Sequence, residues 1–357
     1  MTNGRNLFLK DSRKNNQIQV LRALFCFVII FYHYSTRYSQ LFNISSVFTN
    51  NVFEYLSHFG ITSFFILSGF FLIRRQKVFL TPKQKIIYWL KRFLKLYIPY
   101  LIAVLIIFLL SFTGLYGAER TVSFSAFIEN FFFVNLITGH GNVDGAHWYI
   151  FALITLLFLT FIYDLLPKKN KEWIFYWFVF LIISIISSVL LRTIENNAFI
   201  TQTSKYVTFF LCRGYFPYCF IGIAVYLFDF EKIKQRNNVV VLIAFLLSII
   251  YIASDNWVYL LLLLLSLALI VCCLFRVFAF LEKIKVLVLL GDASYSIYLT
   301  HQNIGYMFLN IFNDKINYYI SIPIVMIIMV IFGLLFWLVI EKNTKRIIAL
   351  IGNHKTV

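Results

Sequence analysis

Charged residues are scarce in this chain. Of its 357 residues only 13% are Asp, Glu, Lys or Arg, whereas 61% are hydrophobic and the mean hydropathy is +0.82. An ordinary soluble domain carries about 25% charged residues. The composition therefore excludes a water-soluble globule, and a large bundle of buried helices would not need so many long apolar runs.

Cysteines are few, and none occurs with other ligand residues or cysteines at the spacing of a metal site or a disulfide framework. All five lie in apolar runs: Cys26, Cys212, Cys219, Cys272 and Cys273. We interpret them as small buried apolar side chains. The histidines show no His-x-x-x-His spacing, and no acidic residue shares the apolar run of His33. The sequence therefore predicts no metal site.

The net charge of +17 has a distribution that argues against nucleic acid as a partner. Its basic residues lie in short segments between apolar runs, and basic patches interleaved with aromatics are absent. This is the pattern of membrane topology and not of phosphate-backbone binding. The partner implied by composition is the lipid bilayer.

Ten apolar runs have about the length that a helix needs to cross about 30 Å of hydrocarbon. We predict an all-α, polytopic integral membrane protein with about ten transmembrane helices. A further apolar segment, Phe127 to Ile137, is too short to span and is expected in the interface. The predicted spans are residues 17–36, 57–73, 96–113, 147–166, 173–191, 211–228, 238–254, 257–275, 290–311 and 319–340.

The basic residues orient these spans. Twenty-five of the 32 lie on the side of the termini and only six on the other, with Arg22 inside a span. The excess of basic residues marks the cytoplasmic side. We therefore expect one domain over residues 1–357 in the plasma (inner) membrane, with cytoplasmic tails at 1–16 and 341–357. The first run lacks a small-residue cleavage site and is expected to be a retained helix.

Arg22 and His33 form the most informative polar pair within a span. Eleven residues separate them, which is three helical turns plus about 20°, so both project from one face about 16 Å apart along the axis. Arg22 would hold the phosphates of a donor near the cytoplasm, and the pantetheine arm would reach His33. The alternative is a snorkelling Arg and a structural His.

Most of the other histidines also fall in the predicted outer half. His58, His140 and His147 lie at or near predicted outer ends of spans, and His301 lies midway along the ninth span. A neutral imidazole in this region suits removal of a hydroxyl proton. Any one of these histidines taken alone is more often a hydrogen-bonded structural residue.

Six motifs follow one another along the chain. They are Gln17 to His33 with its Arg and His, Phe59 to Phe70 ending in Ser68-Gly69-Phe70, Lys91 to Tyr100 with Tyr97-Ile-Pro99, Ala146 to Ile150, Gly291 to His301 with Ser294-Tyr295 and Tyr298-Leu-x-His301, and Ile340-Glu341-Lys342. Each motif alone is weak, but in this order they resemble those of the membrane acyltransferase 3 family, and the resemblance covers essentially the whole chain.

The resemblance implies transfer of an acyl group, usually acetyl from acetyl-coenzyme A, to hydroxyls of extracytoplasmic glycans. The acceptor is a surface polysaccharide or a lipid-linked saccharide. Two departures from the family are expected to matter. The chain lacks an appended SGNH esterase-like domain, and Lys95 stands where Arg is frequent, which weakens a bidentate phosphate contact there.

On this reading His33 is the general base or the acyl carrier, and His301 is a second acid/base group or a structural partner. Arg22, Arg92 and Lys95 would bind acyl-CoA. Ser68, His147, Trp148 and Tyr298 would bind substrate, with Ser68 and Tyr298 as hydrogen-bond donors to the oxyanion. Ser68-Gly69 equally suits close helix packing. Glu341 is expected to tie helices together at the basic side.

Two functions of other classes fit the same spans. A saccharide exporter or flippase without acyl-transfer chemistry also buries polar groups in a bundle. Such transporters often show corresponding broken helices in two halves, and Pro99, Pro217 and Pro323 stand at unmatched places. A scaffold without chemistry is less consistent with the intramembrane Arg22.

Overall fold

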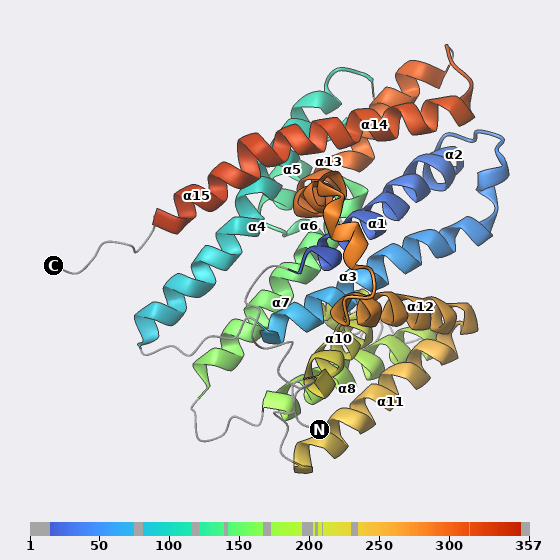
Figure 1. Cartoon of the computed structure of the whole chain (residues 1–357). Helices are drawn as coiled ribbons and strands as arrows, with labels where there is room; N and C mark the ends of the chain where they lie inside the picture. The colour runs from blue at the N-terminus through green and yellow to red at the C-terminus, as the bar shows by residue number, and fades with distance from the viewer. Residues whose placement is uncertain are drawn as a thin grey trace.

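The computed structural model shows a bundle of long helices (Figure 1). It describes residues 15–74, 81–115, 121–138, 142–166, 173–194, 203, 206–208, 210–229, 235–313 and 315–350, and within these it contains no strand. The helices are α1 (Asn16–Tyr32), α2 (Tyr38–Leu41), α3 (Glu54–Arg74), α4 (Pro82–Ser111), α5 (Phe124–Phe131), α6 (Asn135–Thr138), α7 (Trp148–Leu165), α8 (Trp173–Thr193), α10 (Phe216–Asp229), α11 (Gln235–Asp255), α12 (Trp257–Leu274), α13 (Lys285–Asn313), α14 (Tyr318–Phe336) and α15 (Lys342–Leu350).

Every predicted span coincides with a helix, which confirms the all-α membrane class. Among the described residues, seven helices are long and apolar enough to cross a membrane. The apolar parts of α10 and α11 are shorter, and α13 lies outside this set. The number of ten spans therefore remains a prediction. The cytoplasmic location of both termini remains one as well, and residues 1–14 and 351–357 lie outside the described residues. His140 and His354 lie outside them as well.

Helix α13 can carry many polar residues because these side chains are buried inside the bundle. Its serines, Thr300, His301 and Gln302 are buried. Polar groups in a membrane are tolerated where they face other helices. In Figure 1, α14 and α15 run along one side of the bundle and α11 along the opposite side, while α1 packs against both α3 and α13.

Helix starts follow capping residues in the sequence. Asn15 accepts hydrogen bonds from the first amides of α1, and Thr81 forms a capping box with Gln84 ahead of Pro82 in α4. Asn256 and Asn317 cap α12 and α14 in the same way. Each cap satisfies amides that the helix itself leaves unpaired.

Three glycines let helices touch through their backbones. A Cβ at Gly69 would lie 1.9 Å from the Cys219 carbonyl oxygen, and one at Gly222 would lie 1.9 Å from that of Ile66. A Cβ at Gly291 would lie 1.8 Å from the Gln19 carbonyl oxygen. Only glycine permits such approach, so α3 with α10 and α1 with α13 are fixed at these crossings. The packing interpretation of Ser68-Gly69 therefore holds for Gly69.

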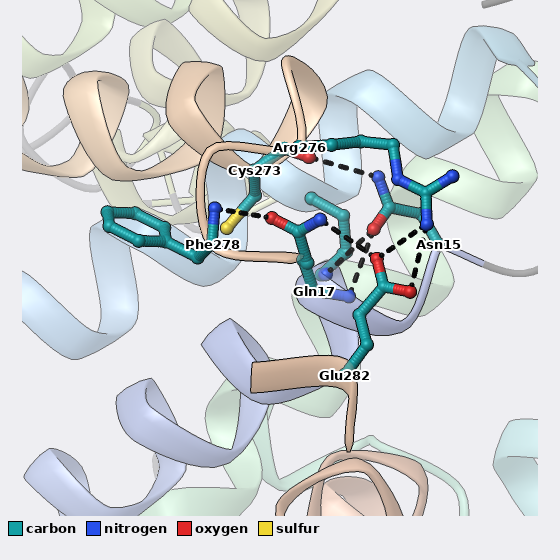
Figure 2. A network of polar contacts seen from close by, with 7 residues as sticks. Asn15, Gln17, Cys273, Arg276, Phe278 and Glu282 are labelled. Atoms are coloured by element: carbon teal, nitrogen blue, oxygen red, sulfur yellow. Dashed lines mark hydrogen bonds and ion pairs between the residues drawn. The ribbon is translucent and has the colours of Figure 1, made fainter. Parts of the chain in front are cut away.

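The start of α1 is attached to the segment between α12 and α13 by a polar network (Figure 2). Gln17 is fully buried; its Nε2 donates to Glu282 at 2.8 Å, and its Oε1 accepts from the Phe278 amide at 3.1 Å. Asn15 Nδ2 donates to the Cys273 carbonyl, and Arg276 pairs with Glu282. Gln17, the first residue of the first motif, thus has a structural role.

We expect Gln17→Ala to destabilise the protein. The change leaves the Phe278 amide without its acceptor and removes one of the hydrogen bonds to Glu282, which costs about 1–3 kcal/mol. The melting temperature of the detergent-solubilised protein should fall, whereas Gln40→Ala, which removes an exposed contact with Glu54, should change it little. Equal melting temperatures for the two variants would contradict this role.

Candidate active site

His33 lies where the winding of the first span changes. Residues His33–Arg37 form a π-helical turn, in which the Tyr38 amide donates to the His33 carbonyl five residues earlier. Such wide turns inside α-helices are frequent at functional sites. The turn places His33 and Arg37, four residues apart, toward the same cavity.

A cavity of about 420 Å³ opens beside this turn. Its walls come from the C-terminal end of the first span, from the N-terminal ends of α3, α7 and α10, and from the middle of α13. It therefore lies at the end of the bundle opposite the start of α1. The lining residues are Ile29, Tyr32, His33, Arg37, Ser57, Ile61, Gly145, Ala146, Trp148, Tyr215 and Tyr298.

His301 lies directly behind His33. The ring centroids are 5.1 Å apart in an edge-to-face arrangement, and His301 is fully buried. His301 Nδ1 lies 2.7 Å from the Tyr298 carbonyl, which can only accept, so Nδ1 carries the proton in the neutral ring. Nε2 then holds a lone pair, and it has no hydrogen-bond partner. His33 Nδ1 lies 3.2 Å from the Tyr306 hydroxyl.

The segment before α7 is bonded to the turn of α13 that carries His301. His147 Nε2 lies 2.9 Å from the Leu299 carbonyl, and the Asn303 amide, four residues later, donates to Asp144 Oδ2 at 3.0 Å. Asp144 Oδ1 accepts from the Ala146 amide at 2.8 Å. We name Asp144 and His147 the α13 clamp, because they bind backbone groups of that turn.

The four predicted substrate-binding residues have different surroundings. Trp148 and Tyr298 line the cavity, whereas Ser68 and His147 are not among its lining residues. Ser68 is hydrogen-bonded to the Tyr149 hydroxyl at 3.1 Å. The Tyr298 hydroxyl donates its one proton to the Ala146 carbonyl at 2.5 Å, so this proton is not available to an oxyanion in this arrangement.

The three predicted donor-binding residues lie away from this cavity. Arg22 is half-buried and donates to Gln19 Oε1 at 3.2 Å on its own helix. The Arg92 guanidinium stacks 4.8 Å from the Trp89 ring centre, and Lys95 is half-buried one turn further along α4. The structure therefore brings His33 and His301 together, whereas the three predicted donor-binding residues are not among those that line the cavity beside His33.

Sequence reasoning missed four polar or aromatic residues of the cavity. Tyr32, Arg37, Ser57 and Tyr215 line it without having been selected. A signal existed for Arg37, since it stands one turn after His33 in the same span. Ser57 and Tyr215 carry no motif that would have distinguished them from many similar residues. Among the described residues, no group of three or more His, Cys, Asp and Glu is placed to hold a metal ion.

Seven helices long and apolar enough to cross a membrane, among the described residues, define a multi-pass membrane protein, and at one end of its bundle two imidazoles lie side by side. The family model of the acyltransferase domain, acyltransferase 3, matches residues 15–342. The chain therefore belongs to this family of membrane acyltransferases, which transfer groups other than aminoacyl groups. No curated protein and no solved structure matches it significantly.

We expect Asp144→Asn to impair acyl transfer while the protein still inserts. The NH2 group of the new side chain would face the backbone N–H of either Asn303 or Ala146, and two donors cannot form a hydrogen bond. The α13 clamp would therefore loosen, and the turn bearing His301 would shift. Misplacement of this kind costs on the order of 10- to 100-fold in rate. Asp255→Asn, which removes an ion pair with the part-exposed Arg192, is the matched control. Equal activity of both variants would rule out a role for the clamp.

Proposed function

We propose that this protein moves an acyl group, most simply acetyl, from cytoplasmic acyl-CoA to a hydroxyl of an extracytoplasmic polysaccharide or lipid-linked glycan. It would work in the plasma (inner) membrane. One observation carries the proposal: His33 lines a cavity at the far end of the bundle from the start of α1, and its ring centroid lies 5.1 Å from that of buried His301. The charge asymmetry supports assigning that end to the extracytoplasmic side.

His33 is the residue we assign to the chemical step. In the tautomer in which Nδ1 donates to Tyr306, Nε2 is a free base. Nε2 takes the proton of the acceptor hydroxyl while the oxygen bonds to the thioester carbonyl carbon. The C–S bond then breaks, and the departing thiolate receives the proton. If His33 carries the acyl group first, Nε2 bonds to the carbonyl carbon as the C–S bond breaks. The acceptor oxygen then bonds to that carbon, the Nε2–C bond breaks, and the hydroxyl proton ends on the thiolate.

His301 supports His33 from behind. Its proton is held on Nδ1 by the Tyr298 carbonyl, so Nε2 remains an acceptor that can take a proton or orient the neighbouring ring. Because the site is buried, a charged imidazole there is costly and a neutral base is favoured. We assign His301 as a second acid/base group of the same reaction.

The cavity walls suit a carbohydrate acceptor. Tyr32, Trp148, Tyr215 and Tyr298 present aromatic rings, against which the C–H faces of a sugar ring can pack. Polar groups on the same walls, among them Arg37 and Ser57, can orient the sugar. The aromatic lining and the family together support the proposal of a glycan acceptor.

Acyl-CoA would reach His33 from the other side of the membrane. Arg22 stands 11 residues before His33 in the first span, about 16 Å along the axis. A pantetheine arm has about this length. Arg92 and Lys95 on α4 would collect the phosphates at the cytoplasmic side, and Arg22 would orient the arm.

His33→Ala should abolish glycan acylation without loss of the protein from the membrane. Removal of a general base costs about 100-fold or more. Mass spectrometry of surface glycans from a deletion strain complemented with each variant measures the acyl content. His301→Gln should lower it less, because His33 remains.

Export of the glycan should be normal in the same strains, which separates an acyltransferase from an exporter. Hydroxylamine trapping of an acyl-histidine distinguishes the acyl carrier from the general base. An expressed and inserted His33→Ala protein that acylates its glycan at the wild-type level would remove the assignment.

Arg22→Gln should weaken binding of the acyl-CoA donor more than binding of the acceptor. Loss of the charge-assisted contact that orients the donor raises the apparent KM for acyl-CoA by about tenfold or more, while the KM for the acceptor changes little. The measurement is initial rates with each substrate varied in turn. Lys342→Gln, which removes a basic residue near the Trp337 ring, serves as the control. An unchanged donor KM in Arg22→Gln would contradict the proposed donor site.

A further inference from the structure

Among the described residues that line the cavity, Arg37 is the one charged side chain. It is exposed, and it ends the π-helical turn that His33 begins. Residues four apart on a helical face have Cβ atoms about 5–6 Å apart. The guanidinium therefore belongs to the same cavity as the catalytic imidazole, within about one sugar ring of it.

No described residue neutralises Arg37. The ion pairs among the described residues are Arg192 with Asp255, Arg276 with Glu282, and Lys345 with Glu341. Glu54, the acidic residue at the start of α3, accepts a hydrogen bond from Gln40. Arg37 also makes no hydrogen bond with another residue of the described chain. Its five N–H donors therefore face the cavity or solvent.

The position of Arg37 is unusual for a basic residue in this chain. Only six basic residues lie on its side of the predicted topology, against 25 on the other. Among these six, Arg192 is part of an ion pair. Arg37 thus lies on the side where basic residues are few, has no ion-pair partner among the described residues, and stands beside His33. Its charge is therefore available to a ligand.

We propose that Arg37 binds an anionic group of the acceptor, a phosphate or a carboxylate, and so selects acidic or phosphate-linked saccharides. The inference rests on the proposed function and specifies its acceptor. A guanidinium matches two oxygens of either group through parallel N–H donors. Given the spacing from His33, the anionic group lies on the sugar that is acylated or on the next one.

The test compares acceptors that differ only in charge. Purified protein receives an acyl-CoA donor and one of three oligosaccharides: a neutral one, its carboxylate-bearing counterpart, or the same sugar with a terminal phosphate. The wild type should show kcat/KM about 10- to 100-fold higher for one or both anionic acceptors than for the neutral one. The carboxylate and phosphate arms identify which group is recognised.

Variants at Arg37 decide whether this residue is responsible. Arg37→Gln should bring the ratio of anionic to neutral kcat/KM close to one, and Arg37→Lys should keep part of it, since Lys retains the charge without the planar fork. Lys315→Gln, which removes an exposed basic residue of the same predicted side, should keep the wild-type ratio.

Three results would overturn the proposal. The first is a wild type with no preference for either anionic acceptor, and the second is an Arg37→Gln protein that keeps the preference. The third is an equal loss of kcat/KM on neutral and anionic acceptors in Arg37→Gln, which would assign Arg37 to lipid headgroups or to packing. A wild type that hydrolyses donor but acylates no saccharide would instead overturn the proposed function itself, and this inference with it.

Discussion

The turn of α13 that carries Tyr298 and His301 is the constraint on which the site depends. In a membrane an unpaired polar group costs several kcal/mol, so hydrogen bonds from neighbouring segments stabilise a turn this polar. The α13 clamp adds such bonds at the Leu299 carbonyl and the Asn303 amide. Tyr34 adds a hydrogen bond to the His301 carbonyl at 2.6 Å, and a Cβ at Gly305 would clash with the Tyr34 ring.

Two π-helical turns meet this central helix from opposite ends. His33–Arg37 ends the first span, and Trp337–Glu341 separates α14 from α15. The first presents His33 to His301, and the second presents buried Glu341 to Ser296, whose hydroxyl donates to it at 2.5 Å. Glu341 also pairs with Lys345, so it ties α13, α14 and α15 together as the sequence suggested. Irregular winding thus places both motif residues against α13.

The helices could be predicted from sequence because hydropathy is a property of local runs. The ninth span was recognisable despite its polarity because its flanks are apolar, and in the structure its polar side chains face inward. The segment Phe127 to Ile137, predicted to be too short to span the membrane, is divided between the short helices α5 and α6. These features need no knowledge of tertiary contacts.

The arrangement of the site required the structure. His33 and His301 are 268 residues apart, and nothing local indicates that their rings lie 5.1 Å apart. His147 was recognisable as a motif residue, but its bond to the Leu299 carbonyl depends on how the segment before α7 meets α13. Arg37 was counted only as a topological charge, because a π-helical turn cannot be read from residue types.

Placing the histidine cavity on the extracytoplasmic side is the central claim, and cysteine accessibility tests it most directly. Ser57→Cys introduces a thiol into the cavity wall, while Cys26, Cys212, Cys219 and Cys273 are buried. A membrane-impermeant thiol reagent should label this variant in intact cells, and it should label Lys91→Cys only after permeabilisation. Labelling of Ser57→Cys that requires permeabilisation would contradict the account.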